Sequence, residues 1–273
     1  MKELTTRALS GLLFASILIG ALQLKYACIA LFFMFGLICL LEFNKLIHQK
    51  NIASYIIFIV LFLAVAFWEN LFKSGKSLSD ISQILLVISV LVNLLLIRDL
   101  FSSKSLPSLL SNHFINTTFY VSSGFVFLLL IALNFENYSP EIITYIFILI
   151  WINDSFAYIV GKNFGKQKLF ESISPKKTVE GFLGGVFFAA LGSYVIANCT
   201  DSLPFTNWLI ISVIVSVFGT LGDLVESKYK RQAGVKDSGK IMPGHGGLLD
   251  RLDSAIFAAP FIYLFLRILN YVS

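Results

Sequence analysis

Long apolar stretches constrain the fold of this chain more than any other feature of its sequence. About 20 consecutive apolar residues are needed to span a bilayer as a helix, and backbone in lipid must satisfy its own hydrogen bonds. Hydrophobic residues make up 57% of the 273 positions and charged residues only 14%, unlike a soluble domain. The sequence therefore predicts an all-α polytopic integral membrane protein with about nine transmembrane helices. The predicted spans cover residues 8–24, 26–43, 53–71, 81–98, 118–135, 141–160, 179–197, 205–222 and 253–271.

The beginning of the chain allows two other interpretations. Lys2 and Arg7 followed by an apolar run resemble a signal peptide. However, a second apolar span follows at once, and Lys25 stands where a lipoprotein cleavage site needs an aliphatic residue. The first span is therefore interpreted as a retained transmembrane helix. Because the first two spans are so close together, a re-entrant hairpin remains an alternative to two crossings.

Basic residues set the expected orientation, since cytoplasmic loops of membrane proteins are enriched in lysine and arginine. With a cytoplasmic N-terminus, 17 of the 21 basic residues fall on the cytoplasmic side, and only Lys25, Lys73, Lys76 and Arg267 fall outside. The N-terminus is therefore predicted to be cytoplasmic. The net charge of +5 then reflects topology and anionic substrates, because the chain lacks the aromatic-interleaved basic surface of a nucleic-acid-binding protein.

Two predicted cytoplasmic loops are long and charged, at residues 161–178 and 223–252. Both fall in the second half of the chain. We therefore divide it into N-terminal transmembrane helices, residues 1–140, and a C-terminal transmembrane catalytic region, residues 141–273.

The segment from Asp223 to Asp253 holds 11 of the 37 charged residues in 31 positions. Charge alone would also fit a solvated loop. Glycines at 244, 246 and 247, around His245, favour a binding site instead. Glycine lets backbone approach a ligand closely, and such turns can direct N–H groups at an anion.

Carboxylates at both ends of this segment indicate a metal site. Asp250 and Asp253 are three residues apart and share a face at the start of the last predicted helix. Asp223 is expected to end the preceding helix, where an acid needs a compensating partner. If the two helices are antiparallel neighbours, Asp223 meets Asp250 at one membrane depth. Such a pair suits Mg²⁺, which binds one or two carboxylates together with substrate phosphates.

Metal ions and basic side chains are what phosphoryl or nucleotidyl transfer requires, because two anions must be brought together. A phosphate nucleophile is already ionised, so His245 is expected to contact a phosphate or carboxylate rather than to act as a base. The sequence has neither a GxxxxGK[ST] P-loop nor a GxSxG nucleophile elbow.

Four short runs carry a resemblance to a known family. They are Ser227-Lys228-Tyr229-Lys230-Arg231, Lys236-Asp237, Pro243-Gly244-His245-Gly246-Gly247 and Asp250-Arg251-Leu252-Asp253. In order and spacing they resemble the signature of the phosphatidate cytidylyltransferases, also called CDP-diacylglycerol synthases. Weaker similarity upstream, at 153–162 and 174–181, extends the match to residues 150–254.

This resemblance implies transfer of CMP from CTP to phosphatidic acid, giving CDP-diacylglycerol and pyrophosphate for phospholipid biosynthesis. It implies Mg²⁺ and a second cation, and a place in the bacterial inner membrane with the active site facing the cytoplasm. A homodimer is compatible with it. By motif position, the catalytic residues would be Asp223, Asp250, Lys177 and Arg251, and the metal ligands Asp223, Asp250 and Asp253. The expected substrate-binding residues are Ser174, Lys176, Lys228, Arg231, Lys236, Asp237, His245 and Asp154.

Two of these assignments have simpler alternatives. Asp154 lies near the end of an otherwise apolar span, where an Asp costs about 2.5–3.5 kcal/mol on insertion. It is expected to be functional rather than a helix-end residue that reaches water. Lys176 and Lys177 precede a predicted helix, whose N-terminus would complete an anion site. The alternative is a basic loop that only sets topology.

Two rival functions remain. A lipid kinase of the polyprenol type would transfer the γ-phosphate of CTP and release CDP. A transporter would carry charged residues at mid-membrane positions of several helices, and the central parts of the predicted spans are nearly free of them.

Overall fold

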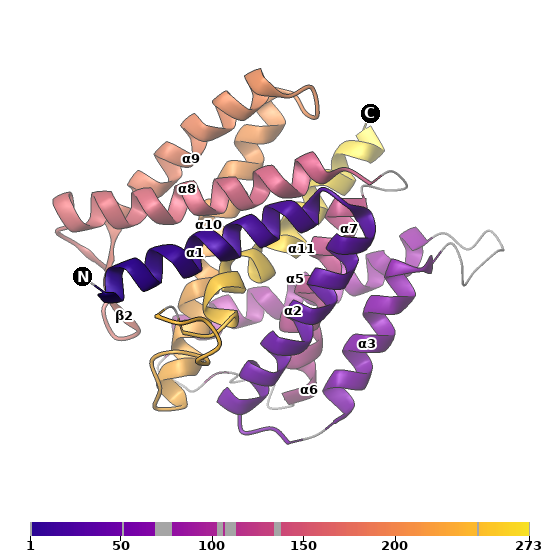
Figure 1. Cartoon of the computed structure of the whole chain (residues 1–273), viewed down its shortest axis with the longest axis horizontal. Helices are drawn as coiled ribbons and strands as arrows, with labels where there is room; N and C mark the ends of the chain where they lie inside the picture. Colours follow the sequence, from indigo (N-terminus) through magenta and orange to yellow (C-terminus); the bar gives the residue numbers. More distant parts are fainter. Residues whose placement is uncertain are drawn as a thin grey trace.

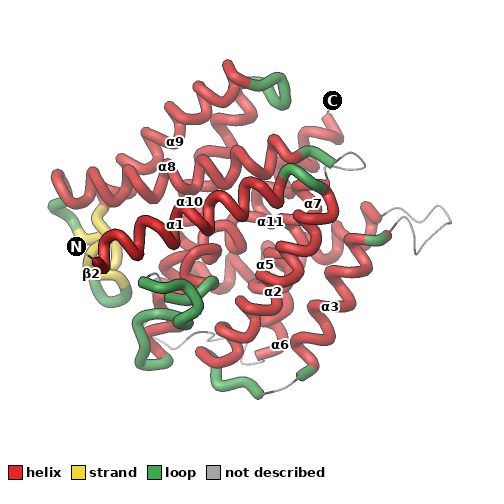
Figure 2. Tube along the Cα trace, viewed as in Figure 1, coloured by secondary structure: helices red, strands yellow, loops and turns green. Residues whose placement is uncertain are grey.

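The computed structural model describes residues 2–50, 52–68, 78–102, 106, 113–133, 138–244 and 246–272. This part of the chain is almost entirely helical (Figures 1 and 2). The N-terminal elements are α1 (Lys2–Leu22), α2 (Lys25–Leu46), α3 (Ala53–Ala66), α5 (Leu78–Leu100), α6 (His113–Asn116), the π-helix η1 (Thr117–Ser122) and α7 (Ser123–Leu133). The C-terminal elements are α8 (Pro140–Phe164), β1 (Lys168–Phe170), β2 (Ser174–Thr178), α9 (Val179–Cys199), α10 (Phe205–Gln232) and α11 (Leu249–Val272).

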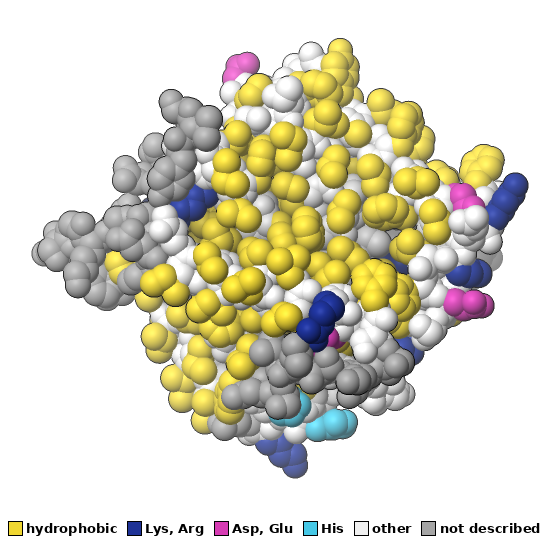
Figure 3. Space-filling view, turned by 180° about the vertical axis from the view of Figure 1, so that it is seen from behind, with side chains coloured by type: hydrophobic (Ala, Val, Ile, Leu, Met, Phe, Trp, Pro, Cys, Tyr) yellow, Lys and Arg dark blue, Asp and Glu magenta, His cyan; other side chains and the backbone are white. Residues whose placement is uncertain are grey.

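Seven helical stretches among the described residues are long and apolar enough to cross a membrane. They are α2, α5, the continuous run α6–η1–α7, α8, α9, α10 and α11. Two further apolar helices, Leu9–Leu22 within α1 and α3, are shorter. Hydrophobic side chains cover most of one face of the molecule, with charged ones mostly towards its edges (Figure 3). The chain is thus a polytopic helical membrane protein, while the count of nine crossings and the orientation stay predictions.

The structure corrects the predicted limits of both charged loops. Asp223 does not end its helix, because α10 continues to Gln232 and the connection to α11 starts only there. The prediction failed because it took the end of the apolar run as the end of the helix. Buried Val225 and Tyr229 keep this last part of α10 packed against the rest of the molecule. The other loop begins after Phe164 and contains an antiparallel hairpin of β1 and β2.

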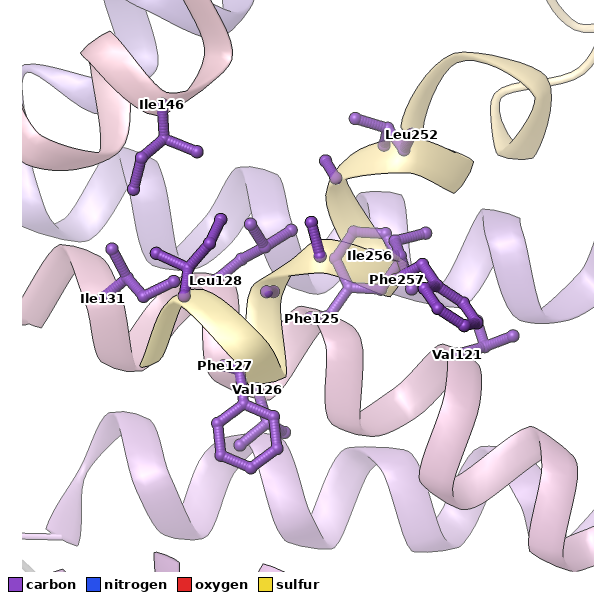
Figure 4. Close-up of a cluster of buried hydrophobic side chains, with 14 of the residues drawn as sticks. Val121, Phe125, Val126, Phe127, Leu128, Ile131, Ile146, Leu252, Ile256 and Phe257 are labelled. Carbon is purple, nitrogen blue, oxygen red and sulfur yellow. The ribbon is translucent and has the colours of Figure 1, made fainter. Parts of the chain in front are cut away.

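A cluster of buried hydrophobic side chains lies where α7 packs against α11 (Figure 4). Phe125 of α7 and Ile256 and Phe257 of α11 are completely buried. Gly124 lets the two helices approach, because a Cβ at this position would lie 2.7 Å from the carbonyl oxygen of Ile256. The N-terminal helices therefore form one packed body with the helix that carries Asp250 and Asp253.

Helices α8 and α9 lie side by side (Figure 1). Glycines of α9 make this close approach possible. A Cβ at Gly185 would lie 2.9 Å from the carbonyl oxygen of Asn153, and one at Gly181 would lie 2.7 Å from that of Ala157. Small residues four positions apart are a common way for membrane helices to pack closely. This packing holds the part of α8 that carries Asp154 beside the start of α9.

Candidate active site

A cavity of about 1010 Å³ is lined by α1, α8, the β1–β2 hairpin, the start of α9, the second half of α10 and the start of α11. Ten of the thirteen residues predicted for the site line it. They are Asp154, Lys176, Lys177, Asp223, Arg231, Lys236, Asp237, Asp250, Arg251 and Asp253. Part of the wall is apolar, with Phe14 of α1 and Trp151 of α8. The cavity therefore offers both charged and apolar surface to a ligand.

Three carboxylates gather where α10 meets α11. One oxygen atom each from Asp223, Glu226 and Asp253 lies within 4.8 Å of the other two. Asp223 and Glu226 are three residues apart and so share a face of α10. Gly222 permits the close contact between the helices, because a Cβ there would lie 3.0 Å from the carbonyl oxygen of Asp253. We call these three residues the acidic cluster.

The acidic cluster fits a divalent cation. The side chain of Glu226 is completely buried, and its Oε1 has no hydrogen-bond partner among the described residues. Asp253 is also buried. Carboxylates this close repel one another unless a cation compensates their charge, and hard oxygen ligands suit Mg²⁺. Asp223, Glu226 and Asp253 are thus three residues that could together hold a metal ion.

Two lysines surround the acidic cluster. Lys177 Nζ, from β2, lies 2.6 Å from Asp223 Oδ2. Lys230 Nζ lies 2.5 Å from Glu226 Oε2 and 2.6 Å from Asp250 Oδ1. Both ammonium groups border the cavity and can offer positive charge to a phosphate there.

The Asp250 carboxylate has different partners from the carboxylates of the acidic cluster. Its Oδ1 faces Lys230, and its Oδ2 accepts hydrogen bonds from Ser238 N at 2.9 Å, Ser238 Oγ at 3.0 Å and Gly247 N at 2.7 Å. Gly246 has a φ of +87°, which favours glycine and brings the loop backbone around this carboxylate. Asp250 and Asp223 line the same cavity, and Asp250 also holds the loop that precedes α11. The metal site predicted to be shared by these two residues stays a prediction.

The β1–β2 hairpin presents the two predicted lysines, and the start of α9 fixes it. Thr178 caps α9, with its Oγ1 accepting a hydrogen bond from Gly181 N at 3.1 Å. The Glu180 carboxylate accepts hydrogen bonds from the backbone N–H groups of Lys166 and Gln167. The hairpin is thereby tied to α9 at both ends.

Two predicted residues are described but do not line the cavity, and a third is not described. The Lys228 ammonium donates hydrogen bonds to Asp99 O at 2.7 Å and Ser102 O at 2.8 Å, at the end of α5. Ser174 begins β2 and is absent from the cavity lining. His245 lies outside the described residues.

Three residues that the structure brings into or next to the site were not predicted from the sequence. Glu226 and Lys230 follow Asp223 at helical spacing, and this spacing could have indicated a shared face if the helix had been extended past Asp223. Glu42 lies far away in the sequence but contacts the start of α11. Its only signal was an acid inside the predicted span 26–43.

Comparison with known proteins places the chain in a family. A sequence model of the cytidylyltransferase family matches residues 5–269. A phosphatidate cytidylyltransferase of Staphylococcus haemolyticus is 38% identical over 226 residues, which cover 81% of each chain. One from Bacillus subtilis is 48% identical over 138 residues, 50% of this chain and 51% of that protein.

A phosphatidate cytidylyltransferase of Staphylococcus aureus is 44% identical over 151 residues, 54% of this chain and 55% of that protein. In these last two comparisons the chain spans about half the length of the relative. The family match itself extends over nearly the whole sequence and includes every element that lines the cavity. The chain belongs to the cytidylyltransferase family.

Proposed function

We propose that this protein is a phosphatidate cytidylyltransferase, which transfers CMP from CTP to phosphatidic acid and releases pyrophosphate. The observation that carries the proposal is the arrangement of the acidic cluster and the basic side chains of the signature around one cavity. The similarity to the Staphylococcus haemolyticus enzyme, over 81% of both chains, supports the choice of substrates.

In the proposed reaction, an oxygen of the phosphatidic acid phosphate attacks the α-phosphorus of CTP. A bond forms between them as the bond from the α-phosphorus to the bridging oxygen of the β-phosphate breaks, and pyrophosphate leaves with the electron pair. The attacking phosphate is already ionised, so no general base is required. The work of the protein is to bring two anions together and to compensate their charge.

Different charged side chains would hold the metal ion and contact the phosphates. Asp223, Glu226 and Asp253 would hold Mg²⁺, which neutralises phosphate charge when bound. Lys177 orients Asp223 through its ion pair and can also contact a phosphate from the hairpin side. Arg251 and Arg231 line the cavity on the α11 and α10 sides, where guanidinium groups suit phosphate oxygens.

We further propose that the cavity faces the cytoplasm from a bacterial inner membrane. CTP is soluble and phosphatidic acid is a lipid, so the site must lie near the membrane surface on the side that contains the nucleotide. Support comes from the predicted nine-span topology, which puts 17 of the 21 basic residues on the side of the cavity loops, and from the bacterial relatives. The homodimer stays a prediction.

A labelling experiment tests the reaction and separates it from its rivals. Purified protein in lipid nanodiscs is incubated with phosphatidic acid, Mg²⁺ and CTP that carries radiolabel on either the α- or the γ-phosphate. We expect α-label in the lipid extract and γ-label in aqueous pyrophosphate. The Asp223→Asn variant, with a neutral residue of the same size, should leave the α-label in the aqueous phase.

Two results would overturn the proposal. Label in the lipid from γ-labelled CTP, together with labelled CDP in the aqueous phase from α-labelled CTP, would identify a lipid kinase. No label in the lipid from either form of CTP, with folded protein, would exclude nucleotide transfer to phosphatidic acid.

A further inference from the structure

Glu42 is an acid in the second half of α2, and only 2% of its surface is exposed. Most of α2 is apolar enough to cross a membrane. A buried acid in such a helix is costly and is retained where it has a specific partner. The groups that bind the Glu42 carboxylate therefore indicate what this residue does.

The Glu42 carboxylate binds the N-terminus of α11. Its Oε2 accepts a hydrogen bond from Leu249 N at 2.8 Å, and its Oε1 accepts one from Leu248 N at 3.1 Å. The first N–H groups of a helix have no partner within the helix, and the helix dipole favours an anion beside them. A side chain from α2 thus caps a helix that begins 207 positions further along the chain.

The loop before α11 is also built around this carboxylate. Ser238 Oγ lies 3.2 Å from Glu42 Oε2. A Cβ at Gly247 would lie 2.6 Å from Glu42 Oε2, and one at Gly239 would lie 2.8 Å from the carboxyl carbon of Glu42. Both distances are too short for a real side chain, so these glycines leave the space that Glu42 occupies.

The same loop residues bind Asp250 from the other side. Ser238 N and Gly247 N donate to Asp250 Oδ2 at 2.9 and 2.7 Å, while Ser238 Oγ lies between Asp250 and Glu42. Glu42 and Asp250 together therefore fix the loop and the first turn of α11. This turn carries Asp253 of the acidic cluster.

We propose that Glu42 is a positioning residue, which holds the loop at 236–248 and the start of α11 so that Asp250 and Asp253 are set against α10. The inference rests on the proposed function, since it assigns Glu42 a role in the same reaction. It also gives the N-terminal region of the chain a direct part in building the site.

Hydrogen exchange measured by mass spectrometry tests this role without any substrate. In Glu42→Gln, one acceptor oxygen becomes an amide NH₂ group, which cannot accept a hydrogen bond from a backbone N–H. Peptides that cover 236–252 should then exchange faster than in the wild type, with other helices unchanged. Glu42→Asp keeps the charge and should restore part of the protection.

Asn44→Ala is the matched control, because Asn44 is buried two residues away in α2 and donates to Ser54 Oγ at 3.0 Å instead of to the loop. It should leave exchange at 236–252 as in the wild type. In the activity assay, kcat of Glu42→Gln should fall about 10- to 100-fold, as for residues that orient a metal site through other groups. Asn44→Ala should retain wild-type kcat.

Two outcomes would overturn the inference: unchanged exchange at 236–252 in Glu42→Gln, or an equal increase in Asn44→Ala. If Glu42→Gln fails to fold, Ser238→Ala removes the hydroxyl shared by the two carboxylates, and the same peptides must exchange faster. A wild-type protein that is inactive with CTP would overturn the proposed function alone. An active wild type with unchanged exchange in Glu42→Gln would overturn the role of Glu42.

Discussion

Lys230 Nζ lies 2.6 Å from Asp250 Oδ1 and joins α10 to α11 at the wall of the cavity. The same ammonium lies 2.5 Å from Glu226 Oε2. All three side chains are almost completely buried, with exposed fractions of 10%, 6% and 0% for Lys230, Asp250 and Glu226. Buried charges persist only when they are paired. Lys230 is therefore what allows two acids to lie together at this point.

Replacing Lys230 with methionine should lower the free energy of unfolding by about 3–5 kcal/mol, because Glu226 and Asp250 would lose their cationic partner. Chemical denaturation in detergent measures this loss. Lys240→Met is the matched control, since Lys240 lies in the same segment but is exposed. Equal stability of the two variants would contradict the assigned role of Lys230.

Lys228→Met should affect stability rather than nucleotide binding. The ammonium group of Lys228 donates to carbonyl oxygens at the end of α5, and such charged hydrogen bonds contribute about 1.5–3 kcal/mol. The KM for CTP should stay at the wild-type value, whereas Arg231→Met, at a cavity residue, should raise it. A raised KM for CTP in Lys228→Met, with unchanged stability, would show that Lys228 binds substrate, as predicted from the sequence.

Lys228 and Lys230 show what a sequence pattern can and cannot predict. Both belong to the signature, and the sequence predicted substrate binding for Lys228 only. Residues two positions apart on a helix do not share a face, so one points to α5 and the other to the cavity. Which face meets the cavity depends on how α10 packs against its neighbours, and the signature does not contain this information.

The apolar spans were predictable because the bilayer demands about 20 apolar residues in a helix. The end of α10 could not be predicted in this way, because ion pairs within the protein let a charged segment remain helical after Asp223. Glu42 could not be assigned either, since its partners, Leu248 and Leu249, are over 200 positions away. Such a contact is fixed only by the tertiary structure.

Gly185→Ala should destabilise the α8–α9 pair and move Asp154 away from the cavity. A Cβ at Gly185 would lie 2.9 Å from the backbone oxygen of Asn153, and overpacking of this kind costs about 1–3 kcal/mol. Gly20→Ala is the control, because a Cβ at Gly20 meets nothing within 4 Å. In thermal unfolding, the melting temperature of Gly185→Ala should be lower than that of the wild type, and the melting temperature of Gly20→Ala should not be lowered. The close packing at Gly185 would be disproved by equal melting temperatures.

Metal binding should depend on Glu226 more than on Asp250. Glu226 has an unpartnered buried oxygen within the acidic cluster, whereas both oxygens of Asp250 are engaged by Lys230 and the loop. Glu226→Gln should therefore weaken Mn²⁺ binding, followed by electron paramagnetic resonance, by more than about 10-fold. It should raise the Mg²⁺ concentration for half-maximal activity by a similar factor. In Asp250→Asn, Mn²⁺ should bind as in the wild type while exchange at 236–252 increases. The reverse pattern, with Mn²⁺ binding lost in Asp250→Asn and kept in Glu226→Gln, would show that Asp250 is a metal ligand, as the resemblance implies, and that Glu226 is not.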